Sequence, residues 1–280
     1  MNIGIVGQGY VGTAVKTVFT SHYDVETYDI KEDCSCISIS DLVSKVGVVF
    51  VCVPTPMNRD GSCNIDIVES VVAEINTAAV DDSDCIVVIK STIPPGTTAR
   101  LNRKFRNITV IFNPEFLTEA NFIDDFKNQN RIIIGGTRPA TTKLRQIYSL
   151  VFPNVSIIKT GSKTAEMVKY MTNTFLATKV SFANEMKMIC DKMNIDYDKV
   201  VEYSTYDERL GKSHWAVPGP DGKLGFGGSC FPKDINALVH MCGKMDIPSS
   251  VISGAIDTNL MVRPEKDWEE LKGRAVVNED

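Results

Sequence analysis

The sequence contains no run of basic residues and no apolar stretch as long as the roughly 18 residues that a membrane helix needs. Lysine and arginine number 30 against 35 acidic residues, which gives a formal charge of −5. This balance argues against a dedicated nucleic-acid binder. The first seven residues lack the basic region and the cleavage pattern of a signal peptide, so we expect no secretion signal.

Patterns typical of metal binding are also missing. The eight cysteines include no Cys-X-X-Cys pair, and the three histidines are scattered. Cys34 and Cys36 have no matching Cys/His pair nearby, so we predict no metal site. Without a secretion signal, reduced thiols are the expected state of all eight cysteines.

The composition is that of an ordinary folded protein. Of the 280 residues, 43% are hydrophobic and 23% are charged, which argues against intrinsic disorder and allows a sizeable core. A chain of this length suggests two domains. We predict an α/β fold, with a Rossmann-like, doubly wound parallel sheet in residues 1–160 and a helical domain in residues 161–280.

Strand and helix signals alternate in the first domain, which is the pattern of βαβ units. The strands are short apolar runs, as expected for a sheet covered on both faces. We predict strands at 2–6, 25–28, 48–53, 85–90, 109–112, 131–134 and 155–158. Helices are predicted at 10–20, 65–77, 97–103 and 140–150.

One long helix is predicted to open the second domain. Residues 162–193 contain neither proline nor glycine, and their apolar residues recur every three or four positions. Ser162 is the expected N-cap. The apolar residues lie on more than one face, which is compatible with a homodimer. Further helices are expected at 197–203, 233–244 and 249–259, a loop at 211–228, and a last helix or a tail at 265–272.

A glycine pattern follows the first predicted strand. Gly7-Gln8-Gly9-Tyr10-Val11-Gly12 fits G-x-G-x-x-G, and Asp29 ends the second strand about 20 residues later. Gly7 permits a tight turn, Gly9 lets the backbone approach a pyrophosphate, and Gly12 lets the helix pack closely on the sheet. The following helix N-terminus favours phosphate. The alternative is a purely structural glycine turn.

Asp29 indicates which dinucleotide would bind. A carboxylate accepts hydrogen bonds from ribose hydroxyls and repels a 2′-phosphate, so the sequence predicts NAD rather than NADP. Lys31 lies close by and weakens that preference.

Four other segments carry candidate chemistry. VPTP (53–56), KSTIPPG (90–96) and NPEFLTE (113–119) follow three predicted strands, at the carboxyl ends where open α/β sheets bind ligands. The fourth, GFGGSCFPKD (225–234), joins a glycine loop to Cys230 near the start of a helix. The helix dipole and Lys233 would lower the pKa of that thiol. The alternative for Cys230 is an ordinary buried core thiol.

Together these residues resemble the UDP-glucose/GDP-mannose dehydrogenase family, from residue 1 to about residue 263. The most specific pieces are KSTIPPGT, NPEFLTE, GFGGSCFPKD and the pair Lys169 and Asn173, and GFGGSCFPKD is more like the UDP-glucose branch. The resemblance implies a homodimeric enzyme of polysaccharide biosynthesis, and the reduced thiols together with NAD use predict a cytoplasmic location. It would oxidise UDP-glucose twice with NAD, giving UDP-glucuronate.

The resemblance also implies catalytic roles. Cys230 is the implied nucleophile, which traps the aldehyde as a thiohemiacetal and then forms a thioester. Lys169 and Asn173 share one helix face and would stabilise an alkoxide-like oxygen and contact the sugar. Glu115 is the implied general base that activates water on the thioester.

Further contacts follow from the same resemblance. Asp234 and Thr92 would orient water or take part in proton transfer. Arg209 would reach the substrate of the neighbouring subunit, and residues 225–228 would offer main-chain N–H groups to the substrate. The expected cofactor contacts are Gly7, Gly9, Tyr10, Val11, Gly12, Asp29, Lys31, Thr55, Thr92, Glu119 and Lys233. The expected substrate contacts are Glu115, Phe116, Leu117, Glu119, Lys169, Asn173, Arg209, Gly225, Phe226 and Gly227.

The sequence departs from the family's pattern at its C-terminal end and in one loop. The family continues into a second Rossmann-like domain that holds the nucleotide, whereas too few residues follow Arg263 for one, so the sequence is either naturally short or a fragment. The loop 211–223 is also longer than expected. Two other functions stay open. One is single-step NAD-dependent oxidation of a smaller hydroxy acid, which would not need Cys230, and the other is a non-catalytic NAD-binding partner subunit.

Overall fold

The computed structural model describes residues 2–79 and 84–278 and divides into two compact units. Unit 1 comprises Met1–Thr55 and Ile65–Lys169, and unit 2 comprises Pro56–Asn64 and Tyr170–Asp280. The sequence placed the division at residue 160. The units instead divide inside the long helix, and the segment Pro56–Asn64 belongs with unit 2.

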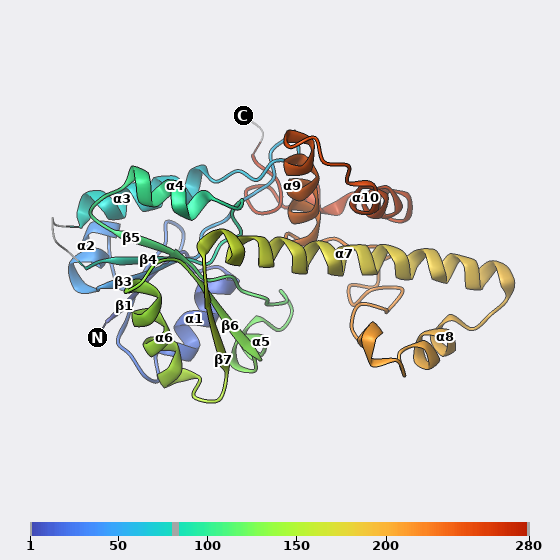
Figure 1. The fold of residues 1–280 in the computed structure, drawn as a ribbon, viewed down its shortest axis with the longest axis horizontal. Coiled ribbons are helices and arrows are strands. Elements are labelled where there is room, and N and C mark those ends of the chain that lie inside the picture. The colour runs from blue at the N-terminus through green and yellow to red at the C-terminus, as the bar shows by residue number, and fades with distance from the viewer. Residues whose placement is uncertain (1, 80–83, 279–280) are drawn as a thin grey trace. The chain divides into compact units, whose positions relative to one another are not determined.

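Unit 1 is built on a seven-stranded sheet in the order β2-β1-β3-β4-β5-β6-β7 (Figure 1). The strands are β1 (Ile3–Val6), β2 (Val25–Tyr28), β3 (Val48–Val51), β4 (Ile86–Ile89), β5 (Thr109–Phe112), β6 (Arg131–Gly135) and β7 (Ser156–Thr160). Each of the seven predicted strands is present, with ends that differ by no more than two residues.

The predicted doubly wound, parallel sheet is confirmed, with one antiparallel pairing, between β5 and β6. β1 to β5 are parallel, but β6 pairs antiparallel with β5 through Phe112 and Gly135, and β7 then runs parallel to β6. The helix between β5 and β6, α5 (Phe122–Lys127), has only six residues and rises about 9 Å. The connection therefore begins and ends at the same edge of the sheet.

Helices cover both faces of the sheet (Figure 1) because its strands are apolar on both sides. Val49 and Val51 of β3 point into one core, and Val48 and Phe50 point into the other. The helices of unit 1 are α1 (Tyr10–Phe19), α2 (Ile39–Lys45), α3 (Asp66–Ala78), α4 (Thr97–Lys104), α5 and α6 (Ala140–Val151). The first core packs on α2, α3 and α4, and the second on α1, α5 and α6.

Unit 2 is helical. The long helix α7 (Ser162–Met193) begins in unit 1 and continues into unit 2, with the bounds that the sequence predicts. It is followed by α8 (Tyr197–Ser204), the short 3-10 helix η1 (Glu208–Leu210), α9 (Phe231–Lys244), α10 (Ser250–Val262) and the 3-10 helix η2 (Asp267–Glu270). Two small cores hold this unit together, one around Ala177, Phe226 and Ile235 and one around Ala183 and Tyr197.

Two further findings bear on function. The loop predicted at 211–228 is present between η1 and α9, and α9 starts two residues earlier than predicted, directly after Cys230. Across the described parts of the chain, we find no helix long and apolar enough to span a bilayer.

Candidate functional site

The glycine turn has the geometry that dinucleotide phosphates require. Gly7 adopts φ +94°, and a Cβ atom on Gly12 would lie 1.8 Å from the Gly7 carbonyl oxygen, so both positions need glycine. A Cβ on Gly9 would meet nothing within 4 Å. The turn is therefore open on the side of Gly9, where α1 begins and its first N–H groups are exposed to an anion.

Asp29 is fixed beside this turn. Its carboxylate accepts hydrogen bonds from the backbone N–H of Gln8 at 2.7 Å and from that of Lys31 at 2.8 Å. The side chain thus stands at the end of β2, next to the phosphate-binding turn. The turn and the carboxylate together fit the pyrophosphate and ribose of NAD. Lys31 is exposed.

The remaining cofactor candidates of unit 1 lie along strand ends and the start of α1. Thr55 and Thr92 are buried, while Glu119 is half-buried. Tyr10 is exposed, and its ring packs on that of Phe122 with centroids 5.1 Å apart. Val11 is half-buried in the first turn of α1.

Glu115 and Lys169 form a buried ion pair in unit 1. Lys169 Nζ donates to Glu115 Oε1 at 2.9 Å and to the Glu115 carbonyl oxygen at 2.6 Å, and the Leu117 N–H donates to Oε2. Burial raises the pKa of the Glu115 carboxyl, but the Lys169 ammonium and these hydrogen bonds lower it by more. The net shift of the Glu115 pKa is therefore downward. Phe116 lies beside the pair, with the Arg131 guanidinium 4.3 Å from its ring centre.

Glu166 is a residue of this site that the sequence did not indicate. It is fully buried on α7, one turn before Lys169, and accepts hydrogen bonds from the backbone N–H groups of Gly96 at 2.5 Å and Thr98 at 2.8 Å. It therefore caps α4 and anchors the segment that carries Thr92. One signal was available: Pro-Pro-Gly precedes α4, so no local Ser, Thr, Asp or Asn side chain can cap it.

Unit 2 brings four candidate residues together at the start of α9. Cys230 is the half-buried N-cap residue. Lys233 Nζ donates to Asp234 Oδ1 at 2.5 Å, and Asn173 Nδ2 donates to Asp234 Oδ2 at 2.6 Å. Lys233, Asp234 and Asn173 are all buried, so Asp234 links the long helix to the cysteine helix.

The charge of Lys233 is stabilised by its surroundings. Burial lowers the pKa of its ammonium, but Asp234, Cys230 and Cys63 raise it by more, and the net shift is strongly upward. A cation that stays charged beside Cys230 favours the thiolate form of that cysteine.

The glycine loop before Cys230 corrects one expectation. The N–H of Gly225 donates to Asn184 Oδ1 at 3.2 Å, and the N–H of Phe226 donates to Asn259 Oδ1 at 2.7 Å. These two amides are used within the protein and are not offered to a substrate. The sequence signal failed because both asparagines lie far from the loop along the chain. Gly227 packs against the Arg263 guanidinium.

Arg209 lies at the protein surface. Its side chain is 88% exposed and is paired with Asp207, the N-cap residue of η1. This pairing raises the pKa of the guanidinium.

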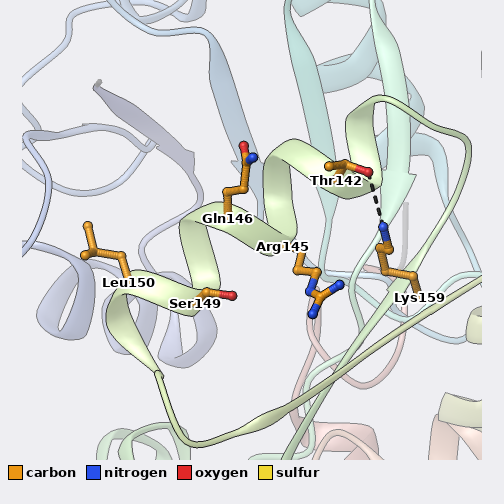
Figure 2. A pocket seen from close by; sticks show the side chains of 6 residues that line it. All are labelled: Thr142, Arg145, Gln146, Ser149, Leu150 and Lys159. Atoms are coloured by element: carbon orange, nitrogen blue, oxygen red, sulfur yellow. Dashed lines mark hydrogen bonds between the residues drawn. The ribbon is translucent and has the colours of Figure 1, made fainter.

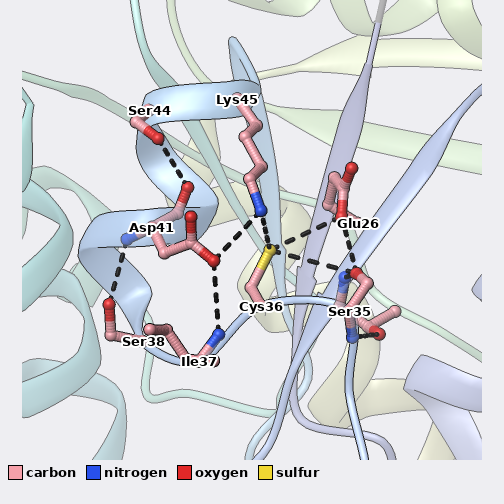
Figure 3. Close-up of polar contacts among 9 residues, drawn as sticks. Glu26, Ser35, Cys36, Ile37, Ser38, Asp41, Ser44 and Lys45 are labelled. Carbon is pink, nitrogen blue, oxygen red and sulfur yellow. Dashed lines mark hydrogen bonds and ion pairs between the residues drawn. The ribbon is translucent and has the colours of Figure 1, made fainter.

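Two other features do not involve the candidate residues. A surface pocket of about 490 Å³ lies on α6 and β7 and is lined by Thr142, Arg145, Gln146, Ser149, Leu150 and Lys159 (Figure 2). Cys36 lies 3.5 Å from Glu26 and 3.7 Å from Lys45 (Figure 3). Burial raises the pKa of the Cys36 thiol. In the ranges 2–79 and 84–278, no group of three or more His, Cys, Asp and Glu side chains is arranged to hold a metal ion.

The chain combines a Rossmann-type dinucleotide-binding unit with helices that carry a cysteine beside a Lys–Asp–Asn cluster. This combination defines a class of nucleotide-dependent oxidoreductases. Comparison with known families makes this specific. The model of the UDP-glucose/GDP-mannose dehydrogenase family's NAD binding domain matches residues 35–152, and the model of its central domain matches residues 163–260. The chain belongs to this family, as its resemblance predicted.

Individual relatives agree with this assignment. The UDP-glucose 6-dehydrogenases of Haloferax volcanii and Bacillus subtilis are 30% and 32% identical to the chain, each over 92% of it. The solved structure of a UDP-glucose dehydrogenase from Pyrobaculum islandicum superposes with a TM-score of 0.84 at 28% identity, over 93% of this chain and 68% of that one. The chain spans 69% and 66% of the first two relatives and about half of others.

Proposed function

We propose that this chain carries the cofactor-binding and reacting parts of an NAD-dependent enzyme that oxidises UDP-glucose twice, to UDP-glucuronate, in the cytoplasm. The observation that carries the proposal is the cluster at the start of α9. There Cys230 is the N-cap, and Lys233, Asp234 and Asn173 are buried and joined by hydrogen bonds. An ordinary core thiol would not need a charged cluster beside it.

The glycine turn and Asp29 would hold the cofactor. The first N–H groups of α1 would bind the pyrophosphate, and the Asp29 carboxylate would accept hydrogen bonds from the adenosine ribose. NAD, when bound, accepts a hydride in each of the two oxidations.

The first oxidation turns the primary alcohol of the sugar into an aldehyde. Lys169 and Asn173 would donate hydrogen bonds to the oxygen as it becomes alkoxide-like. Asp234 and Thr92 would hold the water that receives the hydroxyl proton. Because Asn173 already bonds to Asp234, the amide and the carboxylate would act as one unit.

The second oxidation needs Cys230. Its thiolate would attack the aldehyde carbon, so that a C–S bond forms and the carbonyl π pair becomes an oxyanion. Loss of a hydride from that carbon gives the thioester. Water oriented by Glu115 would then attack the thioester carbon, the C–S bond would break, and the thiolate would be restored with the carboxylate product. Glu115 is ionised beside Lys169 and can accept the proton of that water.

We also propose a homodimer formed through α7. Its exposed apolar side chains include Met171 at 70%, Phe175 at 65% and Phe182 at 50% exposure. These residues recur at intervals of four and seven, so they form one stripe on the helix. Exposed apolar stripes of this kind mark interaction surfaces. Arg209, exposed in η1, would reach the substrate of the neighbouring subunit.

The test is the stoichiometry of NADH released from UDP-glucose by the full chain. Two NADH per sugar are expected, and Cys230→Ser should abolish formation of the acid. Intact-mass analysis during turnover should show a covalent adduct on Cys230. One NADH per substrate with an active Cys230→Ser variant would instead indicate single-step oxidation of a hydroxy compound. NAD binding without turnover of any nucleotide sugar would indicate a partner subunit.

A further inference from the structure

Lys90 is a buried lysine to which none of the proposed catalytic steps assigns a role. It follows β4 directly, at the carboxyl edge of the sheet in unit 1, and only 2% of it is exposed. Its ammonium donates to the Asn113 side-chain oxygen at 2.9 Å, to the Asn113 carbonyl oxygen at 3.3 Å and to the Tyr148 hydroxyl at 3.4 Å. All three protons of the ammonium therefore have acceptors.

Asn113 directly follows β5 and begins the segment that carries Glu115. Its backbone N–H donates to Ile89 at 2.8 Å, and its side-chain amide donates to the Ile133 carbonyl at 2.7 Å. With Lys90 on both of its oxygens, Asn113 is fixed to β4, β5 and β6 at once. Glu115 follows two residues later. The segment that carries its carboxylate therefore starts at Asn113, which Lys90 fixes by hydrogen bonds.

Lys90 also acts on Glu115 through its charge. The titratable groups that face Lys90 are Cys52 at the end of β3, Glu115 after β5, Tyr148 of α6 and Lys169 of α7. Burial lowers the pKa of Lys90 to about 8, with Lys169 lowering it and Cys52 and Glu115 raising it. In return, the Lys90 ammonium is one of the charges that hold the pKa of Glu115 down.

Burying an ammonium group costs free energy of desolvation, which a purely structural role does not require. When a buried charge and its partners are replaced together by apolar side chains of similar volume, stability often changes little or increases. A cation near a carboxylate instead favours the ionised form of that carboxylate.

We propose that Lys90 is a positioning residue for Glu115. Its buried ammonium fixes Asn113, at the start of the segment that carries Glu115, and keeps the Glu115 carboxylate ionised and in position. The catalytic consequence rests on the proposed function, in which Glu115 orients water on the thioester. The positioning itself is a property of unit 1.

The experiment follows the Glu115 carboxyl by ¹³C NMR in glutamate-labelled protein over a pH titration, with the signal assigned by Glu115→Gln. In Lys90→Met, which keeps the side-chain volume and removes the charge, the pKa of Glu115 should rise. Tyr148→Phe is the matched control, because it removes one acceptor of the network and leaves the ammonium. Its Glu115 pKa should stay at the wild-type value, and Lys90→Arg should restore most of the effect.

The wild-type protein gives a second readout in case Lys90→Met fails to fold. The Glu115 signal should show a further inflection near pH 8, where Lys90 loses its proton. That inflection should persist in Lys169→Met, which excludes the neighbouring lysine as its source. An unchanged Glu115 pKa in folded Lys90→Met, or a wild-type Glu115 signal with no inflection as Lys90 loses its proton, would overturn the proposal.

Kinetics separate this proposal from the proposed function. If UDP-glucose is the substrate, Lys90→Met should lower kcat about tenfold and change KM by less than about twofold, since the residue does not bind the sugar. A wild-type enzyme that never turns over UDP-glucose would refute the proposed function, while the Glu115 titration would still decide the role of Lys90.

Discussion

Two thiols of unit 1, those of Cys52 and Cys85, differ from the Cys230 thiol in their electrostatic surroundings. Burial raises the pKa of Cys52 to about 12 and that of Cys85 to about 11, whereas Cys230 is half-buried at a helix start beside a lysine that stays charged. Thiol reactivity follows the thiolate fraction. We therefore expect Cys52 and Cys85, whose thiol pKa values are raised, to react more slowly with electrophiles than Cys230.

A labelling experiment tests this difference. At pH 8, thiolate makes up about one in a thousand or less of Cys85 and Cys52, so iodoacetamide should leave both unmodified in the folded protein and label Cys230. Peptide mapping by mass spectrometry gives the site occupancies, and labelling in urea is the control. Modification of Cys52 at the unfolded rate would contradict the burial argument.

The same two thiols give an alkaline limit to stability. Their pKa values are raised on folding, so the unfolded chain loses these protons first as the pH rises above 9.0, the ordinary thiol value. The stabilisation they provide is complete below pH 9 and is lost progressively toward pH 11 to 12.

Among the elements, α4 depends on a residue 68 positions away from the N–H that it caps. Glu166 supplies the carboxylate that the Pro-Pro-Gly start of α4 lacks, and it does so from the same turn of α7 that leads to Lys169. The helix start and the loop that carries Thr92 are therefore fixed by α7.

Replacing Glu166 should show how much this cap contributes. Glu166→Ala leaves the buried N–H groups of Gly96 and Thr98 without their acceptor, and we expect a loss of about 3 kcal/mol in the free energy of unfolding. Urea unfolding followed by circular dichroism measures it. Glu69→Ala is the control, because Glu69 pairs with Arg100 and Lys104 of the same helix at the surface and should cost less than about 1 kcal/mol. Equal losses in the two variants would contradict the role of the buried cap.

How well elements could be predicted depended on their length and surroundings. The 32 residues of α7 have an uninterrupted helical period, and both of its ends were predicted. The seven-residue α2 was missed, although Ser38 caps it by accepting from the Asp41 N–H, because only Ile39 and Leu42 are buried. The reversal at β6 was also missed, since a strand's direction is set by the path of its connection and not by its own residues.

The same limit applies to the candidate site. Glu115 and Lys169 were each singled out from motifs, but their ion pair joins residues 54 positions apart and could not be read from spacing. Lys90 stood in a quoted motif and received no role, because its burial appears only once β4, β5 and α6 are assembled.

For the whole molecule, the apolar stripe on α7 is the feature with the largest consequence. Phe175→Asp would place a charge in the middle of this stripe, between Met171 and Phe182. We expect the proposed dimer to dissociate, so that light scattering coupled to gel filtration reports the mass of one chain. Leu150→Asp is the matched control, because Leu150 is an exposed apolar residue of α6 in unit 1 and should leave the mass of two chains. A wild-type chain that is monomeric at every concentration would refute the dimer.

The two asparagines behind the glycine loop have a further consequence for how a ligand is received. Because Asn184 and Asn259 already hold the Gly225 and Phe226 amides, the loop acquires its shape when the chain folds and not when a ligand arrives. Folding has already ordered these residues, so ligand binding does not carry the entropy cost of ordering them. Cys230 therefore lies at the end of a loop whose shape is already formed before a ligand binds.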